Sequence, residues 1–178
     1  MTSPNATTYR YCPRCAAPLE SEAHGGFDRR VCRSEGCGFI FWDNPTPVVA
    51  AVVEHEGQLV LARNVAWPSG MFALVTGFLE KNEIPAEAVQ REVEEELGLT
   101  PLGASFIGHY GFERMNQLII AFHVPARGTV RLNEELAEWK HVAFERAAYW
   151  PAATGLALRD WLRGRGYEPQ EMPLPKRG

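Results

Sequence analysis

Glutamates are crowded into the middle of the chain. Four of the five residues from Glu92 to Glu96 are glutamates, and the segment from Gly77 to Leu99 carries seven. In a helix, with Glu92 set at zero, Glu95 falls at about −60° and Glu96 at about +40°, so the three carboxylates share one sector. Like charges at this spacing destabilise a helix, whereas converging carboxylate oxygens are typical ligands of Mg²⁺. The spacing therefore predicts either a solvated face or a divalent-metal site.

The four cysteines form a second group of ligand candidates. They lie within the first 37 residues as two close pairs, Cys12 with Cys15 and Cys32 with Cys37. Two pairs of thiolates suit tetrahedral zinc, and the alternatives are two disulfides or four unrelated thiols. The N-terminus has no apolar segment typical of a secretion signal, and a reducing compartment favours metal over disulfides. We predict a closed, structural zinc site that replaces a hydrophobic core in this segment.

Composition narrows the class of protein. The 178 residues are 46% apolar and 22% charged, which is typical of a globular domain with a core of its own. The net charge of −4 argues against a general polyanion binder, so we do not expect nucleic acid as a partner. No apolar run is long enough to span a bilayer, and we expect a cytoplasmic protein without a membrane partner.

The glutamates need a helix to position them. Pro85 suits the first helical position and Gly98 suits the residue just past the last turn. Ile84, at the capping position, offers no side-chain oxygen. Apolar residues at helical spacing predict the buried stripe of this helix: Ala86, Val89, Val93 and Leu97.

Strand patterns surround this helix. Residues 48–63 predict two apolar strands joined by a short Glu-Gly turn. Further strands are expected within 73–78, 104–112, 116–124 and 138–144, and a second helix within 152–166. We therefore predict an α/β protein with a cysteine-bearing subdomain at 1–44 that starts with a short disordered N-terminus, a main domain at 45–165 and a loose C-terminal tail at 166–178.

The glutamate segment resembles a known family motif. From Gly77 to Leu99 the chain matches all nine specified positions of the Nudix box, G-x5-E-x7-R-E-U-x-E-E-x-G-U with U aliphatic. The resemblance implies an α/β/α sandwich with a mixed sheet. It also implies hydrolysis of the diphosphate that links a nucleoside to another group, with Mg²⁺ or Mn²⁺ as cofactor.

The same resemblance assigns roles to residues. Glu92, Glu95 and Glu96 would bind the catalytic metal, Arg91 would pair with Glu83, and the backbone at Gly77 would pass close to the metal. Which glutamate is the base, and which residues bind substrate, stay unassigned. A further metal-binding glutamate outside the box is also implied, with Glu138 as our candidate and three alternatives: Glu113, Glu134 and Glu135.

A narrower resemblance joins the two parts of the chain. A four-cysteine zinc ribbon followed by a Nudix domain is similar to the NADH pyrophosphatase branch of the family. That branch carries the motif S-Q-P-W-P-F-P-x-S after the box, whereas residues 108–124 here read GHYGFERMNQLIIAFHV. The resemblance therefore implies pyrophosphatase chemistry without identifying the group that leaves.

The sequence supports one leading function and two alternatives. The leading hypothesis is a metal-dependent pyrophosphohydrolase that releases a nucleoside monophosphate from NADH, NAD, ADP-ribose, FAD or a similar small molecule, acting as a homodimer as family members often do. One alternative is a non-catalytic nucleotide-sensing or RNA-binding protein. The other is an enzyme that removes a nucleotide cap from RNA, which salt-dependent RNA binding would favour.

Overall fold

The structure is a computed structural model that describes residues 9–173. The expected disorder at the start of the chain and the last five residues of the expected tail lie outside the described residues. The chain divides into two compact units. One comprises Met1–Pro45 with Arg114–Asn116, and the other comprises Thr46–Glu113 with Gln117–Gly178.

The smaller unit contains a three-stranded antiparallel sheet. Its strands are β1 (Leu19–His24), β2 (Phe27–Cys32) and β3 (Ile40–Phe41), with β2 in the centre. Its buried cluster consists of only Cys12, Leu19 and Cys32. The sequence patterns did not predict these strands, because the strands are short and their mostly polar residues show no apolar alternation. The small cluster agrees with the expectation that this segment has little hydrophobic core.

The larger unit is built on a seven-stranded mixed sheet. The strands run in the order β10-β5-β4-β9-β7, with β6 also paired to β4 and β8 to β9. Only the β4–β9 pair is parallel within this sheet. The bounds are β4 Thr46–His55, β5 Gln58–Asn64, β6 Val75–Phe78, β7 Thr100–Pro101, β8 Ser105–Phe112, β9 Gln117–Arg127 and β10 Leu136–Val142.

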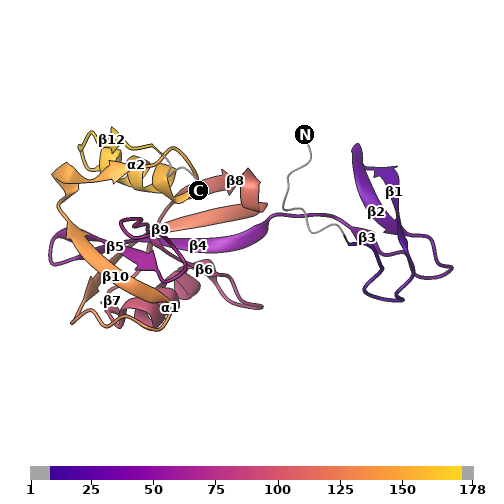
Figure 1. The fold of residues 1–178 in the computed structure, drawn as a ribbon, viewed down its shortest axis with the longest axis horizontal. Helices are drawn as coiled ribbons and strands as arrows, with labels where there is room; N and C mark the ends of the chain where they lie inside the picture. The colour runs from indigo at the N-terminus through magenta and orange to yellow at the C-terminus, as the bar shows by residue number, and fades with distance from the viewer. Residues whose placement is uncertain (1–8, 174–178) are drawn as a thin grey trace. The chain divides into compact units, whose positions relative to one another are not determined.

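One helix covers each face of this sheet, as Figure 1 shows for α1 (Pro85–Leu97) and α2 (Thr154–Gly164). Successive side chains of a strand point to opposite faces. In β4, Val49, Ala51 and Val53 pack with the buried residues of α1, whereas Val48, Ala50 and Val52 pack in clusters with residues of α2 or the turn before it. Because both faces are covered, β4 is a continuous apolar run, and the α/β/α sandwich predicted from the sequence is confirmed.

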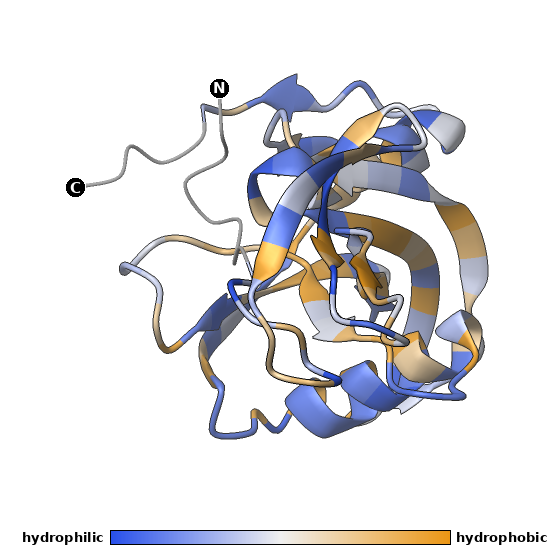
Figure 2. Cartoon of the chain, turned by 90° about the vertical axis from the view of Figure 1, so that its right-hand side faces the viewer, coloured by the Kyte–Doolittle hydropathy of each residue, from blue (hydrophilic) through white to orange (hydrophobic). Residues whose placement is uncertain are grey.

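Hydropathy follows the same arrangement. Figure 2 shows hydrophobic residues concentrated in the strands of the large sheet, while much of the helix at its lower edge is hydrophilic. Neither helix in residues 9–173 is long and apolar enough to cross a membrane.

The pairing of β4 creates the opening in which the candidate site lies. On one side, β4 pairs with β6 through Val48–Ala51 and with β5 only through Val53–His55. Past the residues that pair with β4, β5 remains paired with β10. On its other side, Ala62 of β5 forms an isolated β-bridge with Ala73, which lies just before β6. The ends of β5 and β6 therefore approach the last turn of α1 and the start of β10 around a cavity.

The C-terminal segment is partly ordered. Here β11 (Ala148–Tyr149) pairs in parallel with β12 (Gln170–Glu171). Two short 3-10 helices complete the element list, η1 (Glu113–Met115) and η2 (Phe144–Arg146). The Tyr149 hydroxyl also donates a hydrogen bond of 2.8 Å to the Glu171 carboxylate. Residues 170–171 therefore differ from the loose tail expected from their proline-rich composition, because a short strand elsewhere in the chain pairs with them.

Candidate active site

Helix α1 positions the box glutamates. Its buried residues include Val89, Val93 and Leu97, and the helix ends as predicted where Gly98 takes a left-handed conformation with φ 64°. An added Cβ at Gly98 would lie 3.0 Å from Arg131, so a glycine suits the position for two reasons. The apolar stripe sets the rotation of the helix, and this rotation directs Glu96 inward until its residue is only 8% exposed.

Arg91 joins the helix to the loop before it. Its Nε lies 2.7 Å from one carboxylate oxygen of Glu83, and its Nη2 lies 3.1 Å from the other. Glu83 also accepts a hydrogen bond from the backbone N–H of Glu80. Two parallel charge-assisted bonds give an arginine–carboxylate pair a fixed geometry. The pairing expected from the box pattern is therefore present, and it lowers the pKa of Glu83.

Arg91 also bonds to two of the three carboxylates that the helical spacing grouped together. Its Nη1 lies 2.7 Å from Glu92 and 2.8 Å from Glu95. The side chain of Glu95 is 56% exposed, whereas that of Glu92 is only 13% exposed. Glu92 and Glu96 line a cavity of about 290 Å³, and Glu95 is not among its lining residues. The expected sector thus divides into two inward carboxylates, Glu92 and Glu96, and one outward carboxylate, Glu95, and Arg91 bonds to one of each kind.

Glu96 is the most perturbed carboxyl group in the cavity. Burial, together with the charges of Glu92, Glu135 and Glu95, raises the pKa of Glu96 to about 8. Burial also raises the pKa of Glu92, although Arg91 opposes this shift. Within residues 9–173 no hydrogen-bond donor reaches the Glu96 side chain. A buried carboxylate without a donor is costly, and a hard divalent cation would satisfy it.

Glu135 is a further carboxylate at this cavity, which Glu80 also lines. It lines the cavity together with Glu92 and Glu96, and its charge raises the pKa of both. The segment before β10 carries it there, because the backbone N–H groups of Arg131 and Asn133 donate to the carbonyls of Leu97 and Glu96 at the end of α1. Of the four candidates for the extra glutamate, the structure brings Glu135 to the box residues.

Our first candidate, Glu138, lies elsewhere. A β-bulge between Leu136 and Glu138 shifts the register, so Glu138 stands opposite Arg63 and its carboxylate lies 2.8 Å from Nη2 of that arginine. Arg63 shares a face of β5 with Leu61, which packs in the cluster of α2. Glu138 therefore belongs to the α2 face, whereas Glu96 lies on the α1 side, and Glu138 lines neither cavity around the box. Glu113 and Glu134 line neither cavity as well.

Gly77 leaves room for the Glu92 side chain. A Cβ built on Gly77 would lie 1.9 Å from Cδ and 2.0 Å from Oε1 of Glu92. Its backbone angles are ordinary, so the need for glycine at this position is steric and not conformational. The close approach of the β6 backbone to the carboxylate forms a cradle that any side chain would fill.

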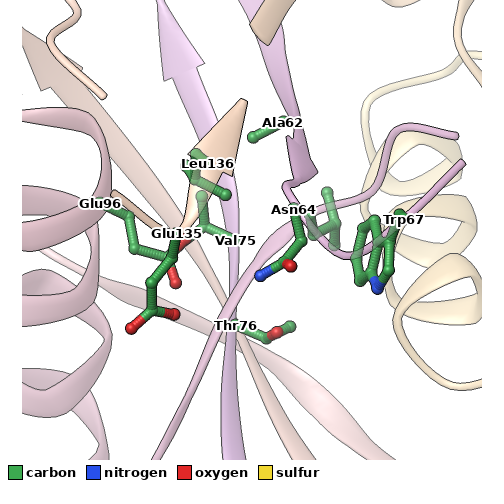
Figure 3. A pocket seen from close by; sticks show the side chains of 9 residues that line it. Ala62, Asn64, Trp67, Val75, Thr76, Glu96, Glu135 and Leu136 are labelled. Atoms are coloured by element: carbon green, nitrogen blue, oxygen red, sulfur yellow. The ribbon is translucent and has the colours of Figure 1, made fainter. Parts of the chain in front are cut away.

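A smaller cavity of about 70 Å³ adjoins Glu96 and Glu135 on the β5 side. Figure 3 shows both carboxylates on one side of this cavity, with Asn64 and the indole of Trp67 across from them. The sequence by itself does not identify substrate-binding residues, and Asn64 is a candidate only in the structure. No local pattern identifies it, because its position depends on the register between β5 and β10.

The four cysteines of the smaller unit meet in space. The sulfurs of Cys12 and Cys37 lie 3.6 Å apart, those of Cys15 and Cys32 lie 3.4 Å apart, and all four lie within 4.8 Å of one another. A tetrahedron with Zn–S bonds of about 2.3 Å has sulfurs about 3.8 Å apart. The backbone N–H of Ala17, with the thiol of Cys32 and the hydroxyl of Ser34, lowers the pKa of Cys15 to about 6, whereas burial and the other three thiols raise the pKa of Cys37 to about 12. The arrangement fits a small zinc ribbon.

Replacing Cys32 with serine should loosen the smaller unit and leave the larger one folded. Cys32 is both a predicted zinc ligand and a member of the small buried cluster of this unit, so its loss removes most of what holds the unit together. Limited proteolysis should then cleave within residues 9–45, and bound zinc should fall by one ion per chain. Ser21→Ala, an exposed position on β1 away from the cysteines, is the matched control. Unchanged zinc content and unchanged proteolysis in Cys32→Ser would contradict a structural site.

Comparison with known proteins agrees with the box and with the fold. The family model described as "NUDIX domain" matches residues 44–163, which is more than half of the chain. Among solved structures, a NUDIX hydrolase from Nitrosomonas europaea superposes with a TM-score of 0.71 and 19% identity, over 93% of this chain and 100% of that one. An identity this low supports the fold alone.

Curated relatives carry names that refer to NAD. The NAD-capped RNA hydrolase NudC of Stutzerimonas stutzeri is 27% identical over 138 residues, which are 75% of this chain and 49% of that protein. The human mitochondrial NAD(P)H pyrophosphatase NUDT13 is 28% identical over 139 residues, which are 76% of this chain and 38% of that protein. The chain thus spans half or less of the length of these relatives.

The match over residues 44–163 includes the whole box, the helix that carries it and the strands around the cavity. These elements form the mixed sheet between two helices that the solved NUDIX hydrolase shares. The chain therefore belongs to the NUDIX domain family.

Proposed function

We propose that this protein is a metal-dependent pyrophosphohydrolase that cleaves the diphosphate of an NAD-type dinucleotide and releases a nucleoside monophosphate. The observation that carries the proposal is the group of carboxylates Glu92, Glu96 and Glu135 around one cavity of about 290 Å³. A diphosphate could not enter an anionic cavity unless cations bound there first. Carboxylates and phosphate oxygens are the ligands that Mg²⁺ and Mn²⁺ share.

Each residue has a defined part in this proposal. Glu92, Glu96 and Glu135 would bind the divalent ions, with Glu95 available once its bond to Arg91 is exchanged. Such ions neutralise the diphosphate and lower the pKa of bound water. Arg91 and Glu83 hold the helix and the loop at a fixed distance, so that the carboxylates keep their positions. Glu138, paired with Arg63 on the α2 face, has no part in metal binding in this proposal.

The names of the relatives and the second cavity support an NAD-type substrate. NudC and NUDT13 are named for NAD-capped RNA and for NAD(P)H, which share a nicotinamide dinucleotide with a central diphosphate. Trp67 lies in the lining of the cavity beside Glu96, where its indole can stack on a base, and Asn64 offers both a donor and an acceptor. The S-Q-P-W-P-F-P-x-S motif is absent, so recognition would depend on residues particular to this chain.

A substrate panel tests the proposal. Purified protein with Mg²⁺ or Mn²⁺ is offered NADH, NAD⁺, ADP-ribose, FAD and an RNA that begins with NAD, and the products are separated by chromatography. We expect a nucleoside monophosphate from at least one dinucleotide. Higher kcat/KM for the RNA would identify a capped end as the source of the diphosphate, and higher kcat/KM for NADH would identify the free dinucleotide. Binding of these compounds without any cleavage would contradict the proposal and favour a nucleotide sensor.

Glu135→Gln and Glu138→Gln should separate the two candidates for the extra ligand. Glu135→Gln should lower kcat by about 100-fold, because one metal-binding carboxylate is lost from the cavity. Glu138→Gln should change kcat less than about threefold, because the carboxylate of Glu138 is bonded to Arg63 and does not reach the cavity. Steady-state kinetics over a range of Mg²⁺ concentrations measures both. The reverse order of effects would return the role to Glu138.

Location and assembly follow as further proposals. None of the four cysteines forms a disulfide, which fits a reducing compartment, and we place the reaction in the cytoplasm. The homodimer stays a prediction that sedimentation velocity can check.

A further inference from the structure

Two histidines and a glutamate outside the carboxylate cavity lie together at one end of the large sheet. They are His55, at the end of β4, Glu56, in the turn that follows, and His141, in β10. One ligand atom from each of the three lies within 4.8 Å of the others. Apart from the four cysteines, this is the only such group of three or more metal-binding side chains in residues 9–173.

The strand register explains why the two histidines meet. His141 stands opposite Val60 of β5, and Val60 stands opposite Val53 of β4. Residues opposite each other share a face of the sheet, and His55 follows Val53 by two residues on that same face. The turn residues Glu56 and Gly57 both have left-handed angles, φ 53° and 72°, which bring the Glu56 carboxylate back toward the histidines.

The hydrogen bonds assign a protonation state to each ring. Nε2 of His55 lies 2.9 Å from the carbonyl oxygen of Gly128, which can only accept, so Nε2 carries the proton. The Nδ1 atom of His55 therefore has a free lone pair. It lies 3.0 Å from Nε2 of His141, which must be the donor in this bond. One proton thus lies between two ring nitrogens whose lone pairs would otherwise converge on one point.

This arrangement resembles a histidine metal site in its supporting contacts. A metal-binding histidine almost always donates its other N–H to a carbonyl or carboxylate, which fixes the ring and its tautomer. His55 already makes that bond to Gly128, and it is only 4% exposed. Trp139 packs edge-on against His141 with ring centroids 4.9 Å apart and limits its rotation. Burial, followed by the neighbouring His55, lowers the pKa of His141 and so favours the neutral ring that metals require.

We propose that Nδ1 of His55, Nε2 of His141 and the carboxylate of Glu56 bind one divalent transition-metal ion, with Zn²⁺ the ion that this donor set favours. Two imidazoles and one carboxylate are a common zinc ligand set, and they leave a fourth position for water. The site is separate from the carboxylate cavity. Leu136, which lines the smaller cavity, stands opposite Asn64 of β5, and His141 stands opposite Val60, so the two are four residues apart along β5, or about 13 Å of strand.

Binding requires one rearrangement of protons. The proton on Nε2 of His141 must leave and Nδ1 of the same ring must take one up from water, so the ring stays neutral and no net proton is released. His55 keeps its proton on Nε2 and its bond to Gly128. The ion would link the β4–β5 turn to the edge strand β10, and we expect bound zinc to raise the melting temperature of the larger unit.

The test counts zinc ions on the full-length protein with its ribbon already loaded. Titration with Zn²⁺ against a chromophoric competitor, in excess Mg²⁺ to occupy the carboxylates, should reveal one additional site. Glu56→Gln should weaken that site by about 100-fold, and His141→Gln should remove it. His109→Gln, an exposed histidine on β8 outside the group, is the matched control and should bind as the unmodified protein does.

Histidine nitrogen chemical shifts give a second readout that does not depend on activity. In long-range ¹H–¹⁵N spectra, zinc should convert His141 from the Nε2–H to the Nδ1–H tautomer and leave the tautomer of His55 unchanged. The proposal is overturned if the zinc-loaded protein takes up no additional ion at micromolar zinc. It is equally overturned if His141→Gln retains the additional ion, or if Glu96→Gln alone abolishes its binding, since the ion would then lie among the carboxylates.

Discussion

Replacing Glu96 with glutamine should remove almost all metal-dependent hydrolysis and at the same time make the protein more resistant to heat. Glu96 is 8% exposed, has no hydrogen-bond donor within residues 9–173 and faces the charges of Glu92 and Glu135. We expect kcat to fall by about 10³-fold, comparable to the loss of a single group that stabilises charge in a transition state. The uncharged amide has a similar shape and avoids the cost of a buried carboxylate.

The gain in stability should depend on pH in a defined direction. The pKa of Glu96 is raised to about 8 in the folded chain, so the folded state keeps a proton that the unfolded state loses above its ordinary pKa. Glu96 therefore makes its full contribution to the free energy of unfolding of the unmodified protein below about pH 4. This contribution is lost as the pH rises to about 8. The difference in melting temperature between Glu96→Gln and the unmodified protein should grow over this range, by about 2–4 °C per kcal/mol.

Thermal melts and kinetics on one matched pair check this prediction. The melts are recorded without added magnesium or manganese, with zinc content measured so that loss of the ribbon ion does not enter the comparison. Glu94→Gln, an exposed glutamate on the same helix, is the control and should change neither activity nor the pH dependence. A Glu96→Gln protein that keeps full hydrolysis would exclude this carboxylate from the metal site. A melting temperature lower than that of the unmodified protein at pH 8 would contradict the cost assigned to its burial.

Gly77→Ala should have the second largest effect, on activity and not on folding. The added Cβ would lie 1.9 Å from Cδ of Glu92, a distance that no real structure tolerates. The obstructing atoms are the far end of a flexible side chain, so the chain can relieve the overlap by moving Glu92 away from the cavity. Displacement of a catalytic group by about 1 Å can cost about 100-fold in rate, and we expect a loss of at least that size.

Gly111→Ala provides the control for this substitution. Gly111 lies in β8, has ordinary backbone angles, and an added Cβ there meets nothing within 4 Å. Both variants should melt within a few degrees of the unmodified protein, and only Gly77→Ala should lose hydrolysis and bind Mn²⁺ more weakly. Manganese binding can be followed by electron paramagnetic resonance. Full activity in Gly77→Ala would show that Glu92 does not need the position that it occupies in the structure.

Much of the architecture was predictable from local patterns. Helix α1 begins at Pro85 and ends before Gly98, as the sequence predicted. Its ends and its apolar stripe were predictable because capping and helical periodicity are properties of neighbouring residues. The β4–β5 pair with its Glu56-Gly57 turn was predicted for the same reason. Arg91 and Glu83 were expected to pair from the box resemblance, and their atoms lie 2.7 Å apart.

The exposure of each box carboxylate was not predictable from helical spacing. Spacing gives the direction of a side chain around the helix axis, and on that basis Glu92, Glu95 and Glu96 were equivalent. The structure separates them, because β6 and the segment before β10 cover Glu92 and Glu96 and leave Glu95 exposed. Solvent exposure depends on what packs against the helix, and this is a property of the whole fold.

What the sequence by itself determined is the local chemistry: a box of carboxylates on one helix, four cysteines in two pairs, and the main strands and helices of the larger unit. Only the tertiary structure decided that Glu135, and not Glu138, faces the box, and that His55 meets His141 across three strands. Both outcomes depend on the register of β10 and on its single bulge. A one-residue shift in a strand reverses the face of every side chain beyond it, and hydrogen bonds to a distant strand fix that shift.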